Sequence, residues 1–87
     1  MNMTHHESHT QFLAVYDAFV NEIFMFFISK KLPRERAKSL TQETFMKTWQ
    51  ELSYGKINGD LRSIHISLQK NADTLIRSGH GKVSFAV

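Results

Sequence analysis

Residues 37–49 read AKSLTQETFMKTW, and this stretch decides the fold of the chain. Its apolar and small residues, continued to position 52, recur at spacings of three and one, which is the pattern of an amphipathic helix. These residues are Ala37, Leu40, Thr41, Thr44, Phe45, Thr48, Trp49 and Leu52. The opposite face carries Glu35, Lys38, Ser39, Gln42 and Met46. We therefore expect one face to pack inside the protein and the other to remain free to meet a partner.

A further helix is expected on each side of this stretch. Upstream, Ser8 and Gln11 have capping-box spacing, and an apolar stripe follows, made of Phe12, Tyr16, Phe19, Val20, Ile23, Phe26 and Phe27. Pro33 suits the first turn of the central helix. Downstream, Asp60 and Gly79 are typical caps of a third helix, with a core stripe of Leu61, Ile64, Leu68, Ala72 and Leu75. The pattern predicts an all-α domain of three helices.

The chain of 87 residues is short enough to hold one domain at most. We expect residues 1–9 to be a flexible N-terminus, residues 10–79 to form the helical domain, and residues 80–87 to be a short apolar tail. The absence of cysteine excludes a disulfide framework and any thiolate metal site.

The charge is unevenly distributed along the chain. Residues 1–29 carry three acidic side chains and no Lys or Arg, whereas residues 30–87 carry a net charge of +6. Such an asymmetry favours an anionic partner for the second part, with nucleic acid the commonest candidate. A basic face that is merely solvated is the alternative.

Membrane insertion, catalysis and metal binding have little support in the sequence. The longest apolar run, from Ile23 to Ile28, is much shorter than the roughly 20 residues that span a bilayer. We therefore expect a cytoplasmic protein that binds no membrane. No phosphate loop or catalytic arrangement stands out, so neither an enzyme nor a cofactor is expected. His5, His6 and His9 have a spacing that would suit a metal only if their segment were helical, and we predict no metal site.

Residues 37–49 resemble conserved region 2.2 of bacterial sigma factors, most closely those of the extracytoplasmic-function group. The family pattern there is Ala, acidic, Asp, Leu, Val or Thr, Gln, Glu, Thr or Val, Phe, apolar, basic, Ala or Thr, and Trp. Nine or more of the thirteen positions agree without a gap. Residues 12–32 are similar to the region 2.1 helix, and residues 68–71 fall where region 2.4 begins.

The resemblance implies a role in transcription initiation. In the family, region 2.2 docks on the clamp helices of the largest RNA polymerase subunit, and the following regions open the promoter and read the −10 element as single-stranded bases. It implies polymerase contacts by Gln42 and Glu43, with Ser39 in place of the usual Asp. Met46 shares one exposed strip with Ser39 and Gln42 because these residues lie three and four apart.

The expected DNA-facing residues lie in the loop before the third helix and on that helix. They are Lys56, Arg62, Lys70, Asn71 and Arg77, which suit phosphate contacts and one base contact. Trp49 follows the core stripe and is interpreted as a packing residue. His65 is interpreted as a half-buried residue of the third helix.

The chain departs from the family in places that bear on function. Lys38 and Ser39 stand where the family has an acidic pair, Ile64 and His65 replace a Trp-Leu pair, and Leu75 replaces an Asp. We also expect no region 4, so that a separate region 4 subunit would complete the protein unless the chain is a trimmed domain or a degenerate remnant.

A second hypothesis is an interaction module that mimics a sigma factor without reading DNA. Such a module would bind an anti-sigma factor or another protein through the surplus aromatic surface of Phe24, Phe26 and Phe27. The third hypothesis is a helical structural domain with no link to polymerase.

Overall fold

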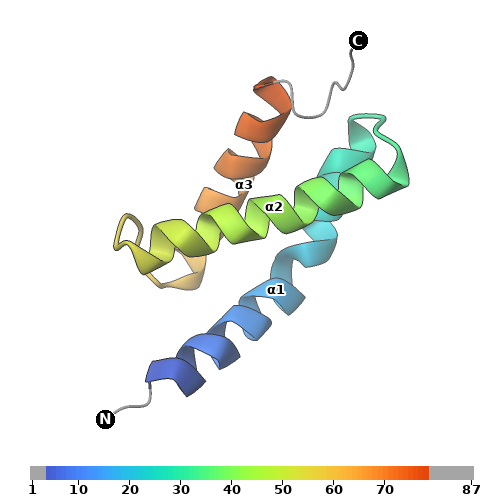
Figure 1. The fold of residues 1–87 in the computed structure, drawn as a ribbon. Coiled ribbons are helices and arrows are strands. Elements are labelled where there is room, and N and C mark those ends of the chain that lie inside the picture. The colour runs from blue at the N-terminus through green and yellow to red at the C-terminus, as the bar shows by residue number, and fades with distance from the viewer. Residues whose placement is uncertain (1–3, 79–87) are drawn as a thin grey trace.

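The computed structural model describes the backbone of residues 4–78 and the side chains of residues 11–78. Three helices make up the fold: α1 (Thr4–Ser29), α2 (Arg34–Ser53) and α3 (Leu61–Arg77) (Figure 1). Each helix packs against both of the others. The prediction of an all-α, three-helix domain is confirmed. The predicted C-cap at Gly79 and the tail of residues 80–87 lie outside the described residues.

The first helix begins earlier than the sequence pattern predicts. Its backbone is helical from Thr4, four residues before the expected cap at Ser8. The predicted helix start at Ser8 is therefore wrong, and residues 4–9, predicted to be part of a flexible N-terminus, have a helical backbone. No Gly or Pro interrupts this segment, so nothing in it opposes helix extension.

Each turn between helices has a local cause. After α1, Lys31 takes a positive φ of 67°. Pro33 is then the N-cap of α2, one residue before the first turn in which the sequence pattern places it. Before α3, Asp60 is the N-cap, and its Oδ2 accepts a hydrogen bond of 3.1 Å from the backbone N–H of Ser63. Hydrogen bonds from Ser63 lower the pKa of the Asp60 carboxyl below its ordinary value of 3.8.

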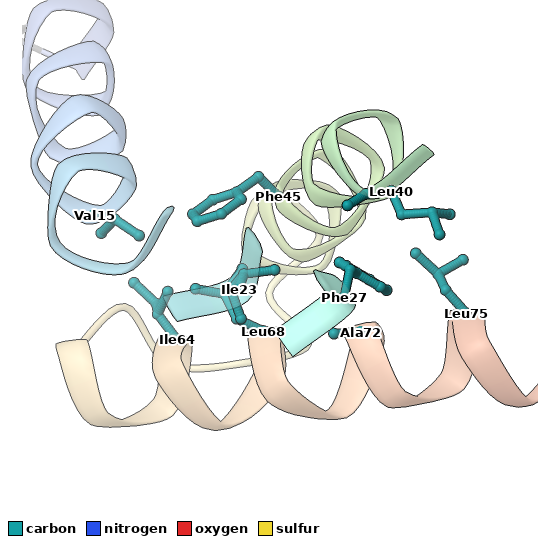
Figure 2. Packing of buried hydrophobic residues seen from close by; sticks show 10 residues of the cluster. Val15, Ile23, Phe27, Leu40, Phe45, Ile64, Leu68, Ala72 and Leu75 are labelled. Atoms are coloured by element: carbon teal, nitrogen blue, oxygen red, sulfur yellow. The ribbon is translucent and has the colours of Figure 1, made fainter. Parts of the chain in front are cut away.

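The core lies where the three helices meet, and Figure 2 shows the α3 side chains pointing toward those of α1 and α2. Its buried hydrophobic residues are Val15, Ile23, Phe27, Ala37, Leu40, Phe45, Ile64, Leu68, Ala72 and Leu75. The stripe predicted from Ala37 to Leu52 is buried as far as Thr48, and its last two members, Trp49 and Leu52, are half-buried. Leu61 does not join the core: it is 57% exposed, because the first residue of α3 lies beyond the cover of the other helices.

An aromatic row connects α1 to α2. Phe12 meets Trp49 edge to face with 5.0 Å between ring centroids, and Tyr16 meets Phe45 at 4.9 Å. Trp49 is half-buried in this row, which agrees with its interpretation as a packing residue. Phe27 is fully buried, so it cannot belong to the exposed aromatic surface that the second hypothesis gave it.

The segment Gln11–Ser29 of α1 is long and apolar enough to cross a membrane, with a mean hydropathy of 1.6. This finding rests on the length and composition of the segment, and core helices of soluble proteins meet the same criterion. In this fold α2 and α3 pack against the apolar face of the segment, and only 17% of its residues are fully buried.

Candidate functional site

The predicted polymerase-binding residues form one exposed surface of α2, which we call the docking strip. Ser39, Gln42, Glu43 and Met46 are all exposed, and Met46 retains 61% of its accessible surface. Because residues three and four apart lie on the same side of a helix, Ser39, Gln42 and Met46 are neighbours. The strip combines a hydroxyl, an amide, a carboxylate and a thioether on a face directed away from the core.

Buried threonines hold the opposite side of α2. The hydroxyl of Thr41 donates to the Ala37 carbonyl at 2.7 Å, and that of Thr44 donates to the Leu40 carbonyl at the same distance. Hydrogen bonds to the preceding turn satisfy polar groups that would otherwise be costly to bury. Because this face of α2 is buried against α1 and α3, the docking strip lies on the outside.

Two of the predicted DNA-facing residues lie at a groove beside the turn between α2 and α3, which we call the turn groove. Its volume is about 530 Å³, and it is lined by Glu51, Gly55, Lys56, Ile57, Asn58, Ser63, Ile66, Ser67 and Lys70. Lys56 comes from the turn and Lys70 from α3, so the fold brings together two cations that are distant in sequence. Gln11 of α1 holds the turn through a 3.0 Å hydrogen bond from Nε2 to the Gly59 carbonyl.

Asn71 does not face outward as predicted. It is 4% exposed, and its Nδ2 donates to Thr48 Oγ1 at 2.8 Å, to Glu51 Oε1 at 3.2 Å and to Ser67 Oγ at 3.3 Å. The prediction of a base contact by Asn71 is therefore wrong for this arrangement. Its amide is directed into the α2–α3 interface, where it connects the two helices.

The remaining predicted DNA contacts, Arg62 and Arg77, do not line the turn groove. Arg62 is exposed in the first turn of α3. Arg77 is at the other end of α3, and its Nε donates to Asp73 Oδ2 at 2.7 Å on a solvent-exposed side. Exposed pairs of this kind are weak, so Arg77 remains accessible to a stronger anion.

A polar cluster between α1 and α3 was not foreseen. His65 stacks on Phe19 with 4.4 Å between ring centroids, and its Nε2 lies 2.8 Å from Glu22 Oε2. Gln69 also donates to that carboxylate oxygen, at 3.1 Å. The hydrogen bond from His65 is the main cause that lowers the pKa of Glu22 below its ordinary value of 4.5. His65 is half-buried, as predicted, and it joins the two helices.

Glu51 is the site residue that sequence reasoning missed. It lines the turn groove, and its Oε1 also accepts a 2.7 Å hydrogen bond from Ser67 Oγ. The available signal was the i, i+4 pair of Ser67 and Asn71, two polar residues beside an apolar stripe. Such a pair on a core-facing side needs an acceptor from another helix.

No metal centre is evident in the described part of the chain, where no three His, Asp or Glu side chains are grouped as ligands would be. His5, His6 and His9 precede the residues whose side chains the structure describes.

Comparisons of the chain with family models, with curated proteins and with solved structures found no match.

Proposed function

We propose that this chain is a sigma region 2-like protein of transcription initiation, which binds RNA polymerase core through the docking strip. The proposal makes it a cytoplasmic binding protein without catalytic activity, cofactor or membrane partner. One observation carries it: in residues 37–49 the apolar and small positions of the sigma-like pattern other than Met46 are buried or half-buried, whereas Ser39, Gln42, Glu43 and Met46 are exposed on one helix. A partner coiled coil would thus meet Gln42 and Glu43, the two docking residues in which the chain matches the family pattern, with Ser39 in place of the usual Asp.

The promoter −10 element is the proposed nucleic-acid partner. Lys56 and Lys70 at the turn groove, with Arg62 on the first turn of α3, offer three cations to a single strand. Exposed Tyr54 beside the groove supplies an aromatic face on which a base would stack. The −35 element would need a separate region 4 subunit or a further part of a longer chain.

The polymerase contact is tested with the double variant Gln42→Ala/Glu43→Ala. Core polymerase, or its isolated clamp coiled coil, is titrated with the wild-type chain and with the variant. We expect the variant to lose at least about tenfold in affinity, since truncation of a central interface residue costs more than about 1–2 kcal/mol. Circular dichroism should show unchanged helix content, because both residues are exposed.

Asp17→Ala is the matched control for this test. It also removes one negative charge from an exposed helix position, but on α1 rather than in the docking strip. We expect its affinity to equal that of the wild type. Equal affinity of the double variant and the wild type would refute the proposed docking role.

A second candidate function is a sigma-mimicking module that binds a protein partner, such as an anti-sigma factor, and reads no DNA. The buried position of Asn71 favours it, because the predicted base contact is unavailable. Binding to single-stranded DNA with the −10 sequence separates the two functions. Sequence-selective binding that weakens steeply with salt would support promoter reading, and its absence would support the module.

A further inference from the structure

A second groove lies between α1 and α2, apart from the turn groove. Its volume is about 360 Å³, and it is lined by Tyr16, Val20, Asn21 and Phe24 from α1 and by Arg34, Lys38, Thr41 and Gln42 from α2. We call it the interhelix groove. Only Gln42 belongs also to the docking strip.

One wall of the interhelix groove is apolar. Tyr16, Val20 and Phe24 follow one another at intervals of four residues, so they form a single row about 12 Å long on α1. All three are half-buried, and each therefore keeps apolar surface open to the groove. An apolar row of this length matches two turns of a second helix.

The other wall is cationic and has the same spacing. Arg34, Lys38 and Gln42 also lie four residues apart, on α2. The two rows run in opposite chain directions, because the Arg34 guanidinium lies 5.4 Å from the centroid of the Phe24 ring, while Tyr16 contacts Phe45 near the other end. Each step along the groove thus pairs an apolar residue of α1 with a polar or cationic residue of α2.

Arg34 and Lys38, the two cations of this wall, are available to an outside anion. Both side chains are exposed. Within the described residues neither forms an ion pair with an acidic side chain, and Arg34 is positioned by the Phe24 ring instead. Lys38 also stands where the family resemblance would place an acidic residue, so this surface has a charge opposite to the one that the family pattern implies.

We propose that the interhelix groove binds an acidic amphipathic helix of a partner protein. Such a helix would lay apolar side chains along Tyr16, Val20 and Phe24, and would place carboxylates one turn apart opposite Arg34 and Lys38. An elongated groove with two parallel rows suits a helix better than a compact anion, because its cations follow one another along α2 instead of converging on one point. Electrostatic complementarity of this kind sets both the orientation and the choice of partner.

The probe is a fluorescent peptide of about 15 residues, the length at which isolated helices become marginally stable. It repeats Leu at helical spacing on one face and carries Glu beside that face. Fluorescence anisotropy measures its binding to the full chain, without polymerase or DNA. We expect saturable binding that weakens with salt, and we expect Lys38→Glu or Arg34→Glu to lower the affinity by about tenfold or more. A peptide with Lys in place of Glu should not bind.

Lys47→Glu is the matched control variant. It makes the same change in charge at an exposed position of α2, and it follows Lys38 by nine residues, which places it on the opposite side of the helix. We expect its affinity for the peptide to stay within about twofold of the wild type, an effect below about 0.5 kcal/mol. Circular dichroism of all variants verifies that each is folded.

Three results would overturn the proposal: no binding of the acidic peptide, equal binding of its Lys counterpart, or an equal loss of affinity in Lys47→Glu. Displacement of the peptide by a nucleoside diphosphate at low concentration would assign the groove to a small anionic ligand instead. Because no polymerase is present, a negative result leaves the proposed docking function untouched. Loss of polymerase binding in the docking-strip variant would likewise leave this proposal standing.

Discussion

At the scale of single residues, Asn71 lies on a basic helix whose sequence suggests DNA binding, yet its side chain stabilises the interface between α2 and α3. Its amide reaches three oxygens, two on α2 and one on α3. Sequence alone places Asn71 next to Lys70 on a basic helix, where a base contact is a natural interpretation. The difference depends on Thr48 and Glu51, whose proximity is a property of the tertiary packing.

We predict that Asn71→Ala destabilises the domain by about 1–3 kcal/mol, since it removes the hydrogen bonds that the buried amide donates across the α2–α3 interface to Thr48 and Glu51. The free energy of unfolding is measured by urea denaturation. Lys70→Ala is the neighbouring control, because Lys70 is exposed and its removal should cost less than about 0.5 kcal/mol. Similar stability of both variants, together with weakened DNA binding by Asn71→Ala, would return Asn71 to the DNA-facing surface.

At the scale of elements, the turn between α2 and α3 contains two glycines, and only Gly55 is required by its backbone conformation. Gly55 has a φ of +75°, and a Cβ built there would meet nothing within 4 Å. Glycine is therefore favoured at position 55 by the backbone conformation and not by a lack of space for a side chain. Gly59 has no such φ, and a Cβ there would make ordinary contacts with Gln11 at 3.6 Å and Leu52 at 3.8 Å.

We predict that Gly55→Ala costs about 1–2 kcal/mol, the cost of a left-handed conformation for an L-residue. Gly55→Asn should cost less, because Asn tolerates that region better. Gly59→Ala is the control and should change the free energy of unfolding by less than about 0.5 kcal/mol. Equal losses at the two positions, measured by thermal or urea unfolding, would contradict this account of the turn.

The helices themselves could be predicted well because their apolar spacing reports directly on burial. The stripe of α2 and the Asp60 cap of α3 are where the pattern places them. The errors fall at ends and on crowded faces. Leu61 has the right spacing but lies at the start of its helix. The sequence pattern places Phe27 both in the apolar stripe and in the surplus aromatic surface, and its burial agrees with the first placement only.

The candidate site was less predictable than the fold. The docking strip follows from the spacing of one helix, so the sequence was sufficient to place it. Both grooves form between segments that are distant in sequence, and their depth depends on how helices cross. The pairing of Phe24 with Arg34 and the approach of Lys56 to Lys70 could not be derived from a linear pattern.

At the scale of the whole molecule, positive charge is present at both ends of α2. Lys56 and Lys70 lie at the turn groove, whereas Lys30 and Lys31 lie in the turn that precedes α2. A helix of 20 residues separates these two groups by roughly 30 Å. Single-stranded DNA bound at the turn groove should therefore respond to one group and not to the other.

We predict that Lys56→Gln/Lys70→Gln weakens binding of single-stranded −10 DNA and lowers its salt dependence. Each lost phosphate contact reduces the slope of log affinity against log salt by about 0.7, so two contacts reduce it by roughly 1.4. Fluorescence anisotropy over a series of salt concentrations measures the slope. Lys30→Gln/Lys31→Gln makes the same change in net charge and should leave the slope near that of the wild type; an equal reduction there would indicate unspecific attraction.

The apolar character of α1 has a consequence for the time before folding. The ribosome releases the chain from its N-terminus, so α1 emerges before the residues that cover it. Synthesis at about 5–20 residues per second takes roughly 2–10 s for the 48 residues from Ser29 to Arg77. During that interval Asp17 and Glu22 are the charged side chains within Gln11–Ser29. A charge near the centre of a spanning helix opposes insertion by about 2.5–3.5 kcal/mol, so Asp17 and Glu22 would make insertion of the nascent helix into a membrane less favourable.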